Sequence, residues 1–151
     1  MRGLFAVLAV PALMLTGCGA PPGAATAPLG VSVDSWELVP VDELNARIEA
    51  AEAAGLDWPR HAIGAALAAL EYGLDARYVE LTAAGNRGEV ADTVVVVVGR
   101  DRFKDDSIRG DWHRAVLYRT SEGTWRFGEL RRAFRCYRGK ASARYWRDHC
   151  P

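Results

Sequence analysis

A chain of 151 residues, half of them hydrophobic, is long enough for one ordinary domain and too short for two. Its net charge is zero, yet residues 31–99 hold four basic against twelve acidic residues (−8), and residues 100–151 hold fourteen against seven (+7). This division predicts either a domain with an acidic and a basic side, or opposite charges that meet and cancel in the folded chain.

The N-terminal segment has the pattern of an export signal. Arg2 is followed by an apolar run from Leu4 to Leu15, which Pro11 interrupts. Twelve residues rise only about 18 Å as a helix, whereas the hydrocarbon core of a bilayer is roughly 30 Å thick. A basic start, a short apolar run and then small residues are typical of a secretory signal peptide, which we place at residues 1–17.

The end of this run carries a more specific motif. Leu15-Thr16-Gly17-Cys18, followed by Gly19, resembles the lipobox of bacterial lipoproteins. The resemblance implies that the Cys18 thiol takes a diacylglyceryl group and that cleavage leaves this cysteine as the first residue. Two or more acyl chains then hold the protein to the cell envelope, facing the periplasm or the cell exterior. The alternative is an ordinary signal peptide that ends near a cysteine.

The residue after the lipidated cysteine bears on the choice of membrane. In Gram-negative lipoproteins an Asp at this position signals retention in the inner membrane. Gly19 therefore favours the outer membrane if the source is Gram-negative.

Residues 18–30 are predicted to form the lipidated N-terminus and a tether. From Gly19 to Gly30 the chain contains only Gly, Ala, Pro, one Thr and one Leu, a composition typical of a linker. As a flexible coil these residues span roughly 20 Å. Residues 31–151 then form a single domain close to the membrane.

Two helices are predicted at the start of the domain. Asp42 is expected at the N-cap of the first and Gly55 at its end, around apolar residues at helical spacing: Val41, Leu44, Ile48 and Ala51. The second is expected to begin after Asp57, with Pro59 in its first turn, and to end at Gly73. Its apolar stripe comprises Ile63, Ala66, Leu67 and Leu70. The short link between the helices predicts antiparallel packing.

Four strands are predicted after the helices, at residues 76–84, 90–99, about 112–120 and 124–136. A turn signal at residues 85–88 separates the first two. The five consecutive valines Val94–Val98 favour a strand covered on both faces. A charged loop is expected at residues 100–111.

The order of these elements defines an α+β fold, in which a helical pair packs on a four-stranded antiparallel meander. In an exported, lipid-anchored chain, this order resembles the NTF2-like and cystatin-like folds of small bacterial envelope lipoproteins, from about Asp34 to Cys136. The resemblance implies a pocket between the helices and a curved sheet. Such a pocket serves enzymes and pure binders alike, so the fold does not decide the function.

Cys136 and Cys150 remain after lipidation of Cys18. In an oxidising compartment two remaining cysteines most simply form one disulfide, which ties the C-terminal tail to the last strand. A redox pair lacks the C-x-x-C spacing, and a zinc site with His149 lacks further ligands.

The remaining candidates for chemistry are acidic and histidine side chains. Asp101, Asp105, Asp106 and Asp111 lack the spacing of a calcium loop, and basic residues between them favour local ion pairs. No histidine has a partner at metal-binding spacing and no catalytic motif is present, so we predict no catalytic residue, metal site or cofactor. In an NTF2-like enzyme, His61 or His113 would line the pocket.

The C-terminal stretch interleaves basic and aromatic side chains. Arginine pairs with anions and aromatic rings stack, so this stretch is a candidate binding surface, with the following residues: Arg131, Arg132, Arg135, Arg138, Arg144 and Trp146. The alternative is an edge strand on which arginines point outward and Phe134 and Cys136 point inward, which protects the edge from aggregation.

Two classes of function follow. The first, which we favour from the sequence, is a non-enzymatic, membrane-anchored module that docks to an envelope protein or an anionic surface component through this basic stretch. The second is a small-molecule binder or an enzyme that uses a helix–sheet pocket. Nucleic acid is not an expected partner, because the chain is predicted to be exported.

Overall fold

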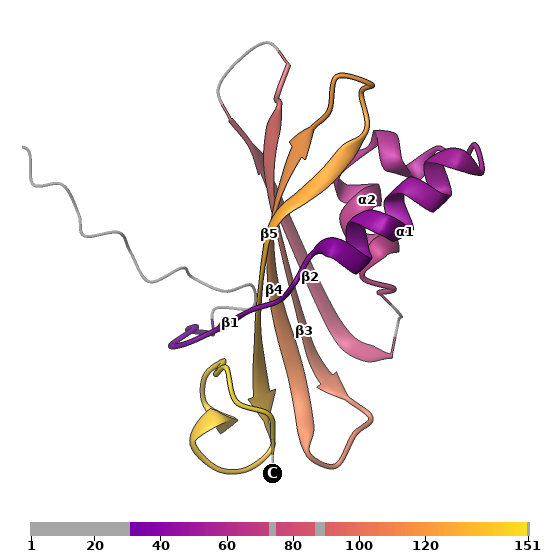
Figure 1. Ribbon diagram of the computed structural model, residues 1–151. Coiled ribbons are helices and arrows are strands. Elements are labelled where there is room, and N and C mark those ends of the chain that lie inside the picture. Colours follow the sequence, from indigo (N-terminus) through magenta and orange to yellow (C-terminus); the bar gives the residue numbers. More distant parts are fainter. Residues whose placement is uncertain (1–30, 73–74, 87–89, 151) are drawn as a thin grey trace, which may run out of the picture.

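The computed structural model describes residues 31–72, 75–86 and 90–150. Two helices lie on one face of an antiparallel sheet whose strand order is β1-β5-β4-β3-β2, which confirms the predicted α+β class (Figure 1). The prediction of four strands is wrong, because a short strand, β1 (Glu37–Leu38), precedes the helices and pairs with β5. Two residues are too few to produce a recognisable alternation. The predicted signal peptide, the predicted lipidation at Cys18 and the predicted tether lie outside the described residues.

The four longer strands form the predicted meander. They are β2 (Ala76–Gly85), β3 (Thr93–Phe103), β4 (Ile108–Arg119) and β5 (Trp125–Cys136). The expected loop at residues 100–111 is largely wrong, because Arg100 pairs with Asp111 and Asp101 with Gly110 in the β3–β4 ladder. Cross-strand ion pairs allow these charged residues to lie within strands. The predicted turn falls partly outside the described residues.

The first helix, α1 (Asp42–Ala53), ends where expected. Gly55 has a positive φ of 72°, and the amide of Leu56 donates to the carbonyl of Ala51 at 2.9 Å, as in a Schellman motif. The predicted N-cap is wrong by one residue, because Val41 occupies that position and Asp42 lies in the first turn.

The second helix starts later than expected. A 3-10 turn, η2 (Trp58–Arg60), contains Pro59, and α2 (Ala62–Ala69) follows. The predicted stripe is partly wrong: Ile63 is 41% exposed, and the buried face consists of Ala65, Ala66 and Ala69. The predicted end at Gly73 lies outside the described residues.

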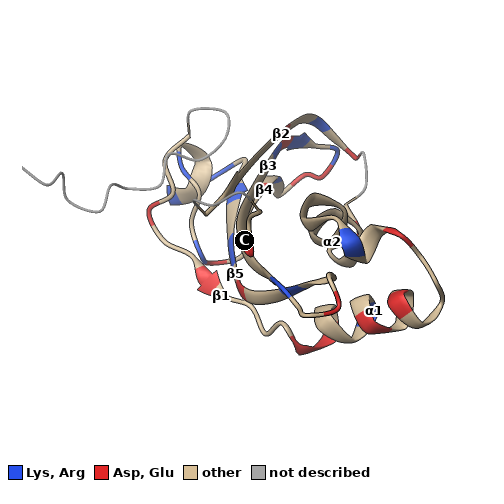
Figure 2. Cartoon of the chain, turned by 90° about the horizontal axis from the view of Figure 1, so that it is seen from above, with Lys and Arg blue, Asp and Glu red and all other residues tan. Residues whose placement is uncertain are grey.

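The main core lies between the helices and the concave face of the sheet, which curves around α2 (Figure 2). Side chains at alternate positions of the strands point to this face, and they pack on Ile48 and the three alanines of α2. The buried strand residues are Val96, Val98, Ala115, Leu117, Trp125, Phe127 and Leu130. Because alanine is small, α2 lies close to the sheet.

The two oppositely charged parts of the sequence meet in the fold. Arg126 pairs with Glu52 of α1 at 2.7 Å, Arg132 pairs with Glu37 at 2.7 Å, and Arg144 pairs with Asp34. These contacts agree with the expectation that charges cancel in the folded domain.

A second, smaller core lies on the convex face. Trp112, Ala133, Val33 and Tyr145 form it, and the chain ends supply the last two residues. Val33 and Tyr145 form a parallel bridge, and Trp146 bridges to Phe134 of β5. The valine run is therefore only partly covered on both faces: Val96 and Val98 are buried, whereas Val95 and Val97 on the convex side are half-buried.

The predicted disulfide between Cys136 and Cys150 is confirmed, with an S–S distance of 1.99 Å. We expect the Cys136→Ser/Cys150→Ser variant to lose about 3 kcal/mol of unfolding free energy, because the bond closes a short loop in the unfolded chain. Urea unfolding of the oxidised protein and of the variant measures this loss. Equal midpoints would contradict it, as would alkylation of both cysteines in unreduced native protein.

Candidate functional site

The helices and the sheet leave a pocket of about 180 Å³ at the C-terminal end of α2. Its apolar wall comes from Val39, Pro40, Leu44, Ala69, Leu70 and Leu130. Polar side chains from three elements also line it: Arg47 of α1, His113 of β4 and Arg132 of β5. Glu43 of α1 is a fourth polar lining residue, so the wall is divided between apolar side chains and convergent polar groups of the kind that fix a small molecule in its site.

His113 is the most unusual of these side chains. The alternation of β4 points it toward the helices, where it is only 8% exposed. Among the described residues, none hydrogen-bonds to its buried Nδ1, and the nearest carboxylate oxygen, Asp111 Oδ2, is 3.8 Å away. The edge of its ring meets the Tyr72 ring at a centroid distance of 5.5 Å.

Burial controls the ionisation of His113. Desolvation lowers the pKa of this imidazole to about 4, and the positive charges of Arg100 and Arg132 act in the same direction. The carboxylate of Asp111 opposes the shift but is outweighed. His113 is therefore neutral at pH 7 and offers one donor and one acceptor.

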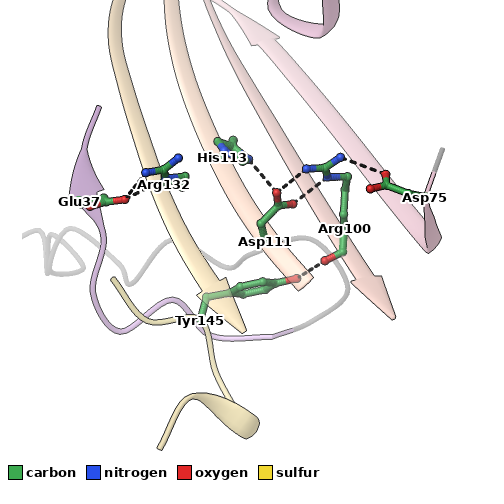
Figure 3. Close-up of polar contacts among 7 residues, drawn as sticks. All are labelled: Glu37, Asp75, Arg100, Asp111, His113, Arg132 and Tyr145. Atoms are coloured by element: carbon green, nitrogen blue, oxygen red, sulfur yellow. Dashed lines mark hydrogen bonds and ion pairs between the residues drawn. The ribbon is translucent and has the colours of Figure 1, made fainter. Parts of the chain in front are cut away.

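Next to His113 lies a buried ion pair between Arg100 and Asp111. The Arg100 guanidinium donates to both carboxylate oxygens, at 2.9 and 2.5 Å (Figure 3). The exposed fractions of the two side chains are 15% and 8%. Asp75 makes a longer contact of 3.5 Å with the same guanidinium. The pair forms part of the wall of a second cleft, of about 390 Å³, beside Phe103 and Phe134.

Tyr72 connects the ion pair with His113. Arg100 lies over the Tyr72 ring at 4.7 Å, and the Tyr72 hydroxyl is buried without a hydrogen-bond partner among the described residues. Burial, reinforced by the charge of Asp111, raises the pKa of this phenol. The site thus contains two buried polar atoms, His113 Nδ1 and Tyr72 Oη, that have no hydrogen-bond partner within residues 31–72, 75–86 and 90–150.

The backbone geometry beside the ion pair requires a glycine. A Cβ at Gly110 would overlap the carbonyl oxygen of Arg100. That carbonyl accepts a hydrogen bond from the Tyr145 hydroxyl at 3.3 Å on the convex side (Figure 3). The C-terminal segment therefore supports the strand that carries Arg100.

The depressed pKa of His113 makes stability depend on pH. The unfolded chain binds a proton near pH 6.5 and the folded chain only near pH 4, so stability is full above pH 6.5 and is lost as pH falls toward 4. Full protonation costs about 3 kcal/mol. We expect His113→Gln to remove this part of the pH dependence, measured by urea unfolding at a series of pH values. The exposed His61 supplies the control, and His61→Gln with the same effect would contradict the assignment.

The predicted basic residues do not form one surface. Arg131 and Arg135 point to the convex face, whereas Arg132 points to the concave face and pairs with Glu37. Arg131 pairs with Glu129 at 2.8 Å and lies over the Trp36 ring. Arg135 is 13% exposed and contacts Asp101 at 3.4 Å.

The other predicted residues lie in the C-terminal segment. Arg144 pairs with Asp34, and Trp146 donates to Asp148 at 2.9 Å. Arg138 is exposed, beside a small hollow near Cys136. Four of the five predicted arginines therefore already have a carboxylate partner within the chain.

Sequence reasoning missed most of the pocket. The interpretation of His113 as a candidate pocket residue agrees with the structure. His61 lies apart from this pocket, is exposed and pairs with Asp57 at 2.9 Å, and it lines a more open hollow between the start of α2 and strands β2 and β3. Arg100 and Asp111 were assigned to a solvated loop with local ion pairs. The ion pair exists but is buried in the sheet, and only the strand register could have revealed it.

No family model, curated protein or solved structure matches this chain. The resemblance to NTF2-like and cystatin-like proteins stays a prediction that rests on the order of the elements. In the part of the chain that the structure describes, no helix has the length and apolar character needed to cross a membrane. Within the same residues, no three His, Cys, Asp or Glu side chains are grouped to hold a metal ion.

Proposed function

We propose that this protein is a lipid-anchored protein of the bacterial envelope whose domain binds a small molecule in the pocket between the helices and the sheet. The observation that carries the proposal is His113, which lines the pocket, is nine-tenths buried and has no hydrogen-bond partner for Nδ1 in the described part of the chain. A buried polar atom without a partner is costly unless a ligand or water supplies one. No group is assigned a catalytic role.

A pocket-filling variant tests the binding proposal. Leu44 lines the pocket, and Leu44→Trp is expected to fill it. Ligand-observed NMR with a set of small alcohols, amides and carboxylates should identify compounds that bind wild type and bind the variant at least about tenfold more weakly. Leu56 is 51% exposed, so Leu56→Trp is the matched control. If no compound binds, or if all three proteins bind equally, the proposal fails.

The anchor is tested separately in cells. An alkyne analogue of palmitate should label the wild type and not the Cys18→Ser variant, and the variant should leave the membrane fraction. A wild-type chain that is exported without label would contradict lipidation and leave the pocket proposal untouched.

Docking through the basic C-terminal end is the second candidate. Arg138 and Lys140 favour it, since both are exposed and neither forms an ion pair within the described residues. Arg135 is a poor test residue because it is buried against Asp101. Crosslinking in intact cells should capture a partner with wild type and lose it with Arg138→Glu/Lys140→Glu.

A further inference from the structure

Part of the convex face of the sheet is apolar and exposed. We call it the convex patch, and it consists of Trp36, Leu38, Val95, Val116 and Tyr118. Direct partners in an antiparallel ladder point to the same face, which places Leu38 with Arg131 and Val95 with Val116. Trp36, Leu38 and Tyr118 are 42%, 67% and 45% exposed, and the two valines are half-buried.

A neighbouring part of the convex face is covered by other segments of the chain, in contrast to the convex patch. Two residues along β4 and β5 from Arg114 and Arg131, Val33 and Tyr145 bury Trp112 to 1% exposure. The convex patch lies outside this covered area. In the register of the sheet, Arg131, Arg114 and Glu129 lie between Leu38 and the two valines, so the apolar side chains alternate with charged ones. Exposed apolar side chains beside basic ones are typical of a protein or membrane contact.

The charges at the patch are predominantly basic. Arg114 and Arg131 are register partners, and both pair with the single carboxylate of Glu129, at 3.2 and 2.8 Å. Arg131 also lies over the Trp36 ring at 4.8 Å. Tryptophan beside arginine suits a membrane interface, where the ring meets the acyl boundary and the guanidinium meets phosphate.

The chain enters the domain on the same face. Val33 packs with Trp112 and Tyr145, and Val31 contacts this cluster, so the segment that follows the proposed tether lies on the convex side. Only twelve residues separate the proposed anchor at Cys18 from Val31, so the convex patch stays at a high effective concentration near the membrane. Even a patch with low intrinsic affinity for phospholipid then remains bound to the membrane.

We infer that the convex patch docks on the membrane that holds the anchor, with anionic phospholipid headgroups against Arg114 and Arg131 and with Trp36 and Leu38 at the acyl boundary. The inference rests on the proposed lipid anchor at Cys18. It orients the domain so that the helices, which lie on the concave side of the sheet (Figures 1 and 2), face away from the membrane, together with the pocket that they form with the sheet.

Fluorescence quenching tests the docking. The acylated protein is purified, Cys18 acylation is verified by mass spectrometry, and the protein is placed in phosphatidylcholine/phosphatidylglycerol vesicles with brominated acyl chains. The chain has five tryptophans, and we expect Trp36 to be the one that is quenched. Quenching should be at least about threefold weaker in Trp36→Phe and in vesicles without phosphatidylglycerol.

Two variants control this experiment. Trp58 lines the concave core, so Trp58→Phe should retain the full quenching. The Leu38 side chain is exposed, so Leu38→Asp should weaken the quenching without changing the melting temperature. If the acylated wild type shows quenching that does not depend on Trp36, the docking is overturned and the anchor is not. A dimer that is crosslinked through the convex patch would have the same meaning. A chain without acylation at Cys18 overturns the anchor as well.

Discussion

Asp111→Ala is expected to destabilise the domain by about 3–5 kcal/mol, because it leaves the Arg100 guanidinium buried without its main partner. Asp75 cannot replace Asp111, since its side chain is 71% exposed and its contact is long, at 3.5 Å. Urea unfolding followed by circular dichroism measures the loss. Most of this loss of stability is expected because Arg100 stays buried and charged without a partner, and a smaller part because its attraction to Asp111 is lost.

A double variant distinguishes these two contributions. Arg100→Met/Asp111→Leu removes both charges and keeps similar volume, so it should regain most of the stability that Asp111→Ala loses. Asp75→Ala serves as the control and should change stability by less than about 1 kcal/mol. A double variant as unstable as Asp111→Ala would show that the attraction itself matters most.

Trp112→Ala should lower the free energy of unfolding by a similar amount, about 3–5 kcal/mol, because it leaves a cavity at the centre of the second, smaller core on the convex face. Trp112 is 1% exposed, and Val33 and Tyr145 pack on it from opposite ends of the chain. Thermal unfolding by calorimetry measures the change. Trp36→Ala is the control, since Trp36 is 42% exposed and should cost about 1 kcal/mol or less. Equal losses for the two variants would refute the proposed burial.

The parts of the fold with local signals could be predicted from the sequence. The end of α1 follows from Gly55, the β2–β5 meander from alternation and turn residues, and the disulfide from the count of cysteines. The elements that were missed lack such signals. Strand β1 has two residues, and its pairing with β5 depends on contacts far apart in the sequence.

The candidate site was less predictable for the same reason. His113 is a single residue in an apolar strand, and nothing local indicates that Tyr72, Arg100 and Asp111 surround it. Their contact requires the register of β3 against β4, which a sequence pattern specifies only loosely. Charges at positions 100–111 also suggested a solvated loop, because buried ion pairs have the same composition as exposed ones.

The pairing of the two chain ends has a mechanical consequence. A pull on the segment before Val33 is passed to the C-terminal segment through two backbone hydrogen bonds, Asp34 N to Tyr145 O at 3.1 Å and Tyr145 N to Ser32 O at 2.9 Å. Force then reaches β5 through the Phe134–Trp146 bridge and the covalent link at Cys136. Because the bridge between Val33 and Tyr145 is parallel, the load shears its two hydrogen bonds together instead of opening them one by one. Pulling on single molecules should therefore give a lower rupture force after reduction of the disulfide.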